Sequence, residues 1–176
     1  MKQDVGDLVR LRSFEPGDAE RYRGWVNDPE IARLIDRAGP VGKAEHEAWY
    51  RALMASASAA VFAVDRLTDG AFIGIVWLYD MHPRHRRAEV RIVIGDKSGW
   101  GGGYGTDALR VLARIAFGTL KLEKLWADVL VTNPRAARAF ERAGFKREGL
   151  LAGDRVQDEG RVDVIRLGIL GDPAKA

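Results

Sequence analysis

A run of glycines, Gly99-Trp100-Gly101-Gly102-Gly103-Tyr104-Gly105-Thr106, is the feature that most constrains this chain. It separates a strand-like segment, residues 89–94, from a segment with helical periodicity, residues 106–119. Glycines at alternate positions leave the backbone N–H groups able to turn toward one anion and to lie close to it. A helix that begins here directs its positive end at the loop, so the pattern favours a diphosphate as the ligand.

Two commoner phosphate-binding motifs do not match this loop. The GxxxxGK[ST] motif requires a Lys after the last glycine, and none follows here. The GxGxxG motif fails in both registers, because Tyr104 and Thr106 occupy the position of the third glycine. The GxGxG pattern that remains is also compatible with a flexible connection between a strand and a helix.

Length and composition are those of one globular domain with a sizeable core, since the 176 residues are 47% hydrophobic and 30% charged. The net charge of +3 is spread along the chain, which supports an anionic partner weakly and nucleic acid poorly. The absence of cysteine excludes disulfides, thiolate ligands and a cysteine nucleophile. His46, His82 and His85 are too scattered for a zinc site, so we expect no metal.

The apolar runs are too short to span a bilayer, and Met1-Lys2-Gln3-Asp4 lacks the apolar core of a signal peptide. We therefore expect a soluble, cytoplasmic protein with no membrane partner.

The remaining pattern predicts a mixed α/β sheet covered by helices. Alternating apolar residues and turn signals place strands at residues 9–14, 60–65, 72–78, 89–94, 124–131, 145–151 and 162–169. Helical periodicity and capping signals place helices at residues 19–26, from residue 29, and at 43–55, 106–119 and 133–143. We expect about seven strands and about four helices in a single domain, residues 1–176, with Asp18 as a helix N-cap, a loop at 79–87 and a flexible tail at 171–176.

The order of elements from Glu89 to Leu150 resembles the acetyl-CoA-binding core of the GCN5-related N-acetyltransferase (GNAT) superfamily. That superfamily has a Q/R-x-x-G-x-G/A loop, a helix, a strand, and a second helix that starts at Asn and ends in Gly-Phe. The matching parts here are the loop from Trp100 to Gly105, residues 106–119, residues 124–131 and the segment from Asn133 to Phe145. The resemblance implies an acyl-CoA N-acyltransferase fold with a CoA-binding core at 89–150 and an amine-substrate region mainly at 15–58 and 79–88.

Two N-terminal segments resemble one branch of the superfamily, the ribosomal-protein N-terminal acetyltransferases and their relatives that act on polyamines and amino-sugar nucleotides. They are Leu8-Val9-Arg10-Leu11-Arg12 and Trp25-Val26-Asn27-Asp28-Pro29-Glu30. This resemblance implies acetyl transfer from acetyl-CoA directly to a primary amine on a nucleotide-linked amino sugar, a protein N-terminus or a small molecule. A homodimer is common among such relatives.

The resemblance also implies which residues hold the cofactor. The backbone of Ile92, Val93 and Ile94 would pair with the pantetheine arm as an additional strand. Asn133 would touch the pantetheine, although its position also suits a plain helix N-cap. The amides of the loop would hold the diphosphate, and Arg138 completes the set of cofactor contacts. These loop residues are Trp100, Gly101, Gly102, Gly103, Tyr104, Gly105 and Thr106.

Acetyl transfer needs an uncharged amine, so a base must take a proton from it. The resemblance assigns this role to Glu89, which could otherwise be a surface glutamate that balances a neighbouring arginine. The tyrosine that usually protonates the leaving thiolate is replaced by Phe140, which leaves Tyr104 or a water as the proton donor. Phe140 also motivates an alternative, a non-catalytic module that binds or senses acyl-CoA.

Substrate specificity should come from the early helices and the loop before Glu89. The residues there that are able to bind an amine substrate are Trp25, Asn27, His46, Trp77 and Tyr79. His46 is equally typical of an interior histidine.

Overall fold

The computed structural model describes residues 4–171, which form one seven-stranded sheet with the strand order β1-β2-β3-β4-β5-β7-β6. The strands are β1 (Val9–Ser13), β2 (Ala60–Arg66), β3 (Phe72–His82), β4 (Arg87–Ile94), β5 (Lys124–Leu130), β6 (Lys146–Gln157) and β7 (Gly160–Leu170). The helices are α1 (Pro16–Val26), α2 (Pro29–Leu34), α3 (Lys43–Ala55), α4 (Tyr104–Arg114) and α5 (Pro134–Arg142). The predicted mixed α/β fold with seven strands is confirmed.

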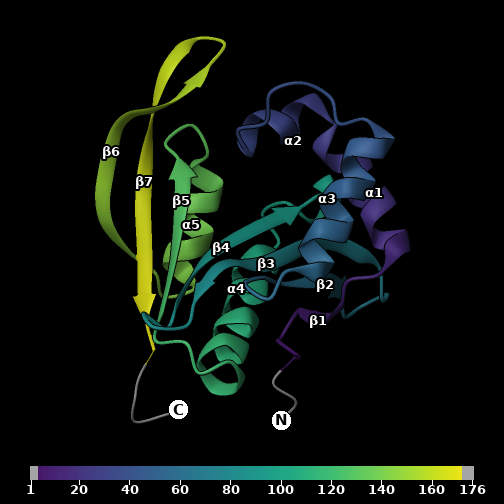
Figure 1. Cartoon of the computed structure of the whole chain (residues 1–176), viewed down its shortest axis with the longest axis vertical. Coiled ribbons are helices and arrows are strands. Elements are labelled where there is room, and N and C mark those ends of the chain that lie inside the picture. The colour runs from purple at the N-terminus through teal and green to yellow at the C-terminus, as the bar shows by residue number, and fades with distance from the viewer. Residues whose placement is uncertain (1–3, 172–176) are drawn as a thin grey trace.

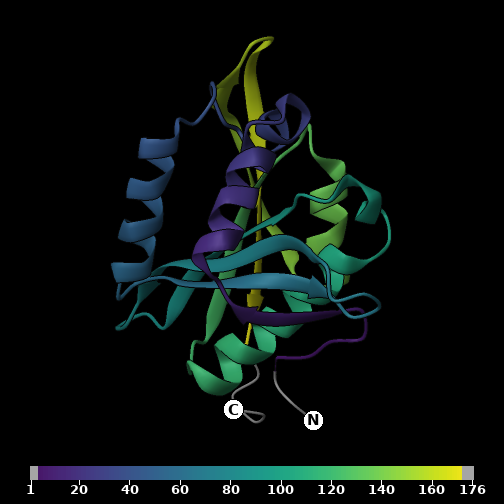
Figure 2. The same ribbon diagram turned by 90° about the vertical axis from the view of Figure 1, so that its right-hand side faces the viewer.

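Helices cover both faces of the sheet and make two separate cores (Figures 1 and 2). One core packs α1, α2 and α3 on the β2–β4 region, with Tyr22, Ile31 and Trp77 among its buried side chains. The other packs α4 and α5 on the opposite face, where Leu109, Leu112 and Phe140 are buried. Because both faces are covered, β3 is an almost continuous apolar run from Phe72 to Leu78.

Among the described strands, β4 and β5 form the one parallel pair, and they are hydrogen-bonded only at their beginnings. Their register contains three residue pairs and ends with Glu89 opposite Trp126. Beyond that point β4 continues to pair with β3, and β5 continues to pair with β7. The sheet therefore opens between β4 and β5, and their diverging ends are visible at the centre of Figure 1.

Several predicted boundaries differ from the structure. The expected loop at 79–87 is mostly strand, because β3 runs on to His82 and a bulge after Tyr79 takes up the polar residues. The polar residues 153–160, between the strands predicted at 145–151 and 162–169, form the end of a long β6–β7 hairpin.

The helices also differ in detail. Asp18 is not the N-cap of α1; the cap is Glu15, and Asp18 is the third helical residue of a capping box. Residues 29–34 and 43–55 form separate helices, as the sequence pattern predicted, and the described part has five helices where about four were expected. The regular α-helix α4 ends at Arg114 and continues as a π-helical turn, Ile115–Thr119. Apart from Gly171, the predicted tail lies outside the described residues.

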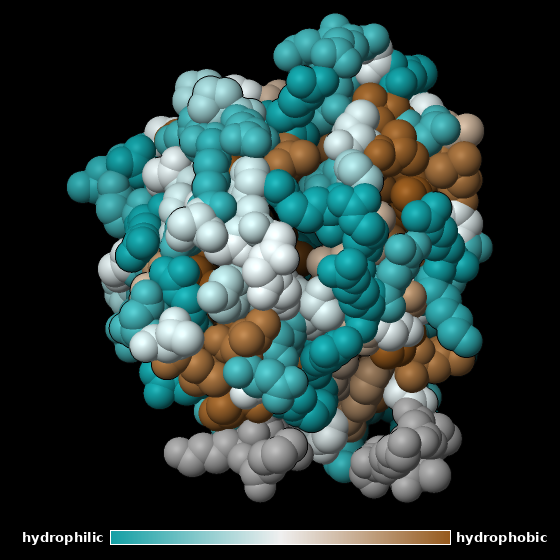
Figure 3. Space-filling view, turned by 180° about the vertical axis from the view of Figure 1, so that it is seen from behind, coloured by the Kyte–Doolittle hydropathy of each residue, from teal (hydrophilic) through white to brown (hydrophobic). Residues whose placement is uncertain are grey.

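The surface seen from behind is mostly hydrophilic, with hydrophobic areas that are separate from one another (Figure 3). Exposed apolar side chains on the edge strand β6 include Leu150 and Val156. Within residues 4–171, no helix has both the length and the apolar character needed to cross a membrane.

A buried carboxylate, Asp107, fixes the edge strand β1 to the helix behind the glycine loop. Its Oδ2 accepts hydrogen bonds from the backbone N–H groups of Leu8 at 2.7 Å and Val9 at 3.0 Å. These residues are about a hundred positions apart in the chain, so the contact joins the N-terminus of the fold to its centre.

We predict that Asp107→Ala destabilises the protein by about 2–3 kcal/mol, because it leaves two backbone N–H groups without their acceptor in a buried setting. Urea unfolding monitored by circular dichroism measures the change. Glu47→Ala, which alters a carboxylate on the exposed face of α3, is the control and should change stability by less than about 0.5 kcal/mol. Equal effects of the two substitutions would contradict the structural role of Asp107.

Candidate active site

A cavity of about 350 Å³ lies between the glycine loop, the free edge of β4, α2 and α5. Eleven of the twelve residues expected to hold the cofactor line it, and Gly102 is the one that does not. The lining residues from the expected set are Ile92, Val93, Ile94, Trp100, Gly101, Gly103, Tyr104, Gly105, Thr106, Asn133 and Arg138. The structure therefore brings these residues together around one cavity, and their role in holding the cofactor stays a prediction.

The start of α4 supplies open backbone donors to the cavity. Gly103 is the N-cap residue, with φ of +87°, and no side chain caps this end of the helix. Gly101 also has a positive φ, +84°. These left-handed conformations favour glycine and turn the chain so that the first N–H groups of α4 are available to an anion.

The described side chains that line this cavity include three arginines and no carboxylate. Arg138 was expected from the sequence, whereas Arg135 and Arg142 were not. The guanidinium carbon of Arg135 lies 3.6 Å from the ring centroid of Trp100, and burial lowers the pKa of Arg135. A partly buried cation beside a helix N-terminus favours a negatively charged ligand, which fits the diphosphate of CoA.

Asn133 is the N-cap of α5, as its sequence position suggested. Its Oδ1 accepts a hydrogen bond from the N–H of Ala136 at 3.1 Å. Its Nδ2 donates to the carbonyl of Leu34 at 3.2 Å, which joins α5 to the end of α2 across the cavity.

Glu89 lies at the point where β4 and β5 separate. It shares a face of β4 with Val93, whose side chain is buried in the α1–α3 core, so its carboxylate points to that side of the sheet. Oε1 of Glu89 accepts from Nε of Arg91 at 2.6 Å, and 15% of the side chain is exposed. Burial lowers the pKa of Arg91, but the hydrogen bond and charge of Glu89 outweigh it, so the pKa is raised.

The neighbours of Glu89 on this face include Tyr79, which the sequence singled out, and Trp126, which it did not. Tyr79 is opposite Glu89 on β3, is 45% exposed and lies under the guanidinium of Arg91, at 4.6 Å. Trp126 is opposite Glu89 on β5. Arg166 of β7 lies 4.1 Å from the ring centroid of Trp126 and is paired with Asp128, with 2.8 Å between Nη2 and Oδ2. The register of β5 becomes known only from the fold, so no local pattern pointed to Trp126.

Tyr104, the expected proton donor, and Phe140, which stands in place of the usual tyrosine, occupy different parts of the fold. Tyr104 is in the first turn of α4, where Arg66 lies 5.8 Å from its ring centroid. Phe140 is 3% exposed and packs edge-on against Phe145, with 5.0 Å between the ring centroids. Tyr104 lines the cavity at the start of α4, whereas Glu89 lies in the sheet and does not line that cavity.

Three of the expected substrate residues are packed inside the α1–α3 layer instead of facing a cleft. His46 is 4% exposed, and its Nε2–H donates to the carbonyl of Ala19 at 2.6 Å. Trp77 is 7% exposed and contacts Tyr22, while Trp25 packs on Phe72 and covers Gly95. The contacts of His46, Trp77 and Trp25 are therefore structural. Aromatic side chains spaced along the inner face of a helix or strand pack into the core.

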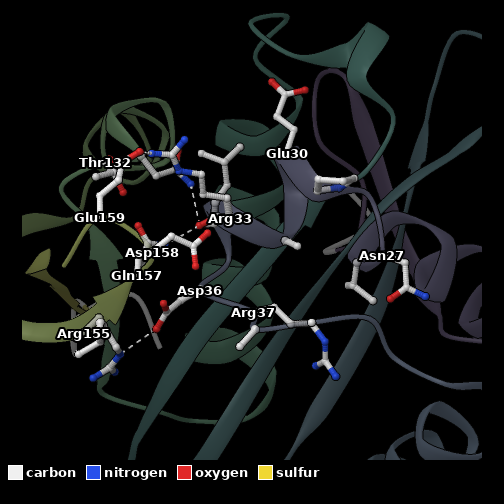
Figure 4. A pocket seen from close by; sticks show the side chains of 18 of the residues that line it. Asn27, Glu30, Arg33, Asp36, Arg37, Thr132, Arg155, Gln157, Asp158 and Glu159 are labelled. Carbon is white, nitrogen blue, oxygen red and sulfur yellow. Dashed lines mark hydrogen bonds and ion pairs between the residues drawn. The ribbon is translucent and has the colours of Figure 1, made fainter. Parts of the chain in front are cut away.

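Asn27 connects the end of α1 to the loop before α3. Its Nδ2 donates to the carbonyl of Val41 at 3.0 Å, and its Oδ1 accepts from the N–H of Val41 at 2.7 Å. It also lines a second, larger cavity of about 1580 Å³ between α2, the loop that follows it and the tip of the β6–β7 hairpin (Figure 4). The two cavities share Leu34, Asn133 and Arg135 as lining residues, so they adjoin one another.

Within residues 4–171, no group of three or more His, Asp or Glu side chains is arranged to hold a metal ion.

Comparison with known proteins identifies the family. Residues 9–146 match the model of the acetyltransferase (GNAT) domain, which is well over half of the chain. The chain therefore belongs to the GNAT acetyltransferase family, and its chemistry is acetyl transfer from acetyl-CoA to an amine.

The relatives include spermidine acetyltransferases. The spermidine N(1)-acetyltransferase of Escherichia coli K12 is 35% identical over 143 residues, which cover 81% of this chain and 75% of that protein. The enzyme of the same name from Vibrio cholerae is 33% identical over 98 residues, and the chain spans about half of that protein, 56%. A crystal structure of spermidine N-acetyltransferase from Vibrio cholerae in complex with CoA and spermine has a TM-score of 0.85 and 27% identity, covering 92% of this chain and 95% of that chain.

The ribosomal-protein branch is represented more weakly. A putative ribosomal N-acetyltransferase of Bacillus subtilis is 28% identical over 153 residues. The N-terminal segments that suggested this branch therefore support the superfamily and do not separate the ribosomal enzymes from the polyamine enzymes.

We predict that Gly103→Val weakens CoA binding at least about tenfold, because a β-branched residue resists the left-handed backbone that presents the first amides of α4. Isothermal titration calorimetry with CoA measures the dissociation constant. Gly70→Val is the matched control, since Gly70 also has a positive φ, +71°, but lies in the β2–β3 turn outside the cavity. Similar losses of CoA affinity in both variants would mean that general backbone strain causes the effect, and not the loss of the amides presented by the glycine loop.

The burial of His46 predicts a pH dependence of stability. Burial lowers its pKa from 6.5, so the unfolded chain binds a proton at a pH where the folded protein does not. His46 makes its full contribution to the free energy of unfolding above pH 6.5. This contribution decreases as the pH falls from 6.5 toward the lower pKa of the folded state.

The free energy of unfolding, measured with denaturant, should therefore decline as the pH is lowered from 7.5 to 5. The decline should be shallower in His46→Gln, whose side chain does not titrate. The slopes are compared and not the absolute stabilities, because the substitution also alters the contact with Ala19. Parallel slopes would mean that another group causes the decline.

Proposed function

We propose that the protein acetylates a primary amine of a small polycationic acceptor of the spermidine type, with Glu89 as the general base. One observation supports this most strongly. The sheet opens at Glu89, and the cavity with the glycine loop and the three arginines lies along the edge of β4 that this opening exposes. A cofactor arm along that edge would lead to the carboxylate.

The cofactor supplies a thioester carbonyl, which a neutral amine attacks at carbon while the carbon–sulfur bond breaks. The free edge of β4 at Ile92 to Ile94 offers N–H and C=O groups that suit the amides of a pantetheine arm. Arg135 and the start of α4 would hold the diphosphate.

Glu89 would accept the proton that the attacking amine must lose. Arg91 keeps this carboxylate in position through two hydrogen bonds, and its guanidinium also covers one face of the neighbouring Tyr79 ring. No tyrosine stands at position 140, so in this proposal Tyr104 or a water protonates the departing thiolate.

The acceptor class is supported by the relatives named above and by the second cavity. Spermidine is the acceptor in the names of the Escherichia coli and Vibrio cholerae relatives. Five carboxylates line the larger cavity beside the opening, and carboxylates suit an acceptor with several ammonium groups. They are Glu30, Asp36, Asp154, Asp158 and Glu159.

Acetyl transfer is tested with acetyl-CoA and a panel of spermidine, an aminoglycoside, an amino-sugar nucleotide and a ribosomal-protein N-terminal peptide, with products identified by mass spectrometry. Acetylated spermidine as the main product supports the proposal. Turnover of the nucleotide or the peptide alone would overturn the acceptor class and keep the enzyme. CoA binding without any product would favour the non-catalytic acyl-CoA-binding module.

We predict that Glu89→Gln lowers kcat by about 10²–10³-fold and removes the rise of kcat/KM with pH that the base produces. The dissociation constant of CoA should stay within about twofold, because Glu89 does not line the cofactor cavity. Glu123→Gln is the control, since Glu123 is an exposed carboxylate that pairs with Arg86. Full activity of Glu89→Gln across the pH range would refute the assignment of Glu89 as the base.

A homo-oligomer is part of the proposal. One structure of the Vibrio cholerae spermidine N-acetyltransferase, with a TM-score of 0.76 and 25% identity, is dodecameric. The edge strand β6 of this chain exposes Leu150 and Val156, which would suit a contact between copies.

A further inference from the structure

The tip of the β6–β7 hairpin is joined to the region of α2 across the mouth of the larger cavity (Figure 4). Nη2 of Arg33 lies 2.8 Å from Oε1 of Glu159, and Nε of Arg155 lies 3.3 Å from Oδ2 of Asp36. Nε2 of Gln157 also donates to the carbonyl of Arg33 at 2.9 Å. The partners in these contacts are more than a hundred residues apart in the chain.

Ion pairs, including these two, involve four of the five carboxylates that line the cavity. Arg155 is paired with Asp154 as well as with Asp36, so one guanidinium serves two carboxylates. Glu30 is paired with Lys97, at 2.8 Å. Four arginines line the cavity beside its five carboxylates, so it presents mostly paired charges to an incoming molecule.

These pairs are easily exchanged. Arg33 and Glu159 are 60% and 78% exposed, and exposed ion pairs contribute little to stability. A ligand ammonium group that approaches Glu159 or Asp36 can replace the guanidinium at modest cost, because both cations are solvated before and after the exchange. The arginine of this chain and the acceptor therefore compete for the same carboxylate.

We propose that Arg33 and Arg155 set the charge selectivity of the acceptor site, by acting as internal counterions that a polycationic acceptor must displace. The inference rests on the proposed function, since it concerns the acceptor of that reaction. An acceptor with several ammonium groups gains ionic contacts with the carboxylates. It must displace the two arginines to make these contacts, which reduces the net gain in binding. A monoamine uses its single nitrogen in the reaction and gains almost nothing from these carboxylates.

The consequence is a weak preference for polyamines in the natural protein and a stronger one when the arginines are removed. Arg33→Gln leaves Glu159 without its partner, and Arg155→Gln leaves Asp36 and Asp154 without theirs. Neither arginine lines the cofactor cavity, so KM for acetyl-CoA should stay within about twofold of the natural value.

The test compares kcat/KM for spermidine with kcat/KM for butylamine, a monoamine as long as one arm of spermidine, in the full-length enzyme. The ratio should rise about fivefold or more in Arg33→Gln/Arg155→Gln, and the rise should shrink at 0.5 M salt. Arg147→Gln is the matched control: Arg147 is also an exposed arginine of β6 in an ion pair, but it lies outside both cavities and should leave the ratio unchanged. Arg155→Lys keeps the positive charge and should retain most of the natural ratio.

The outcomes separate the two proposals. Turnover of both amines with a ratio that is unchanged in the double variant overturns the selectivity inference and leaves the proposed function intact. A natural enzyme that binds CoA and acetylates neither amine overturns the proposed function, and the inference with it. The two single variants, each expected to give part of the rise, replace the double variant if it does not fold.

Discussion

The divergence of β4 and β5 after three residue pairs is the constraint on which the rest of the molecule depends. A continuous parallel pair would satisfy the backbone groups of Ile92 to Ile94 and close the cavity beside them. Because β4 is paired with β3 and β5 with β7, each strand keeps one complete neighbour while they separate. The fold thus exposes a strand edge in the centre of the sheet and not at its border. Helices on both faces of the sheet protect this central edge from pairing with another chain.

The cavity beside the glycine loop could be anticipated from the sequence because most of the residues expected there lie in one continuous segment, residues 92–106. The glycine loop follows β4 directly and begins α4, so strand, loop and helix signals all refer to the same place. Positive φ at Gly101 and Gly103 agrees with the reason for expecting glycine there. Arg135 was missed because an arginine two residues after a helix start is common, and only its contact with Trp100 distinguishes it.

The acceptor side was predictable only in part, because its walls come from segments that are distant in the sequence. Asn27 lines the larger cavity, and Tyr79 is exposed on β3 opposite Glu89. His46 and Trp77 are buried instead, since an aromatic residue in an amphipathic pattern is compatible with a core or a site, and tertiary packing decides between them. The contact of Arg33 with Glu159 depends on how far the β6–β7 hairpin extends, and the polar residues at 153–160 gave no sign of strand pairing.

Asp107 gives the edge of the sheet a thermodynamic connection to the cofactor. The residue lies in the first turn of α4, the turn whose amides face the cavity, and it holds the N–H groups at the start of β1. A ligand that orders this turn also reduces the fraction of time in which β1 separates from β2, since fraying of the strand requires the same carboxylate to lose its donors. Ligand binding at this turn would thereby stabilise an outer strand that lies outside the cavity, so that saturation of the cavity and the resistance of the sheet edge to pairing with another chain would rise together.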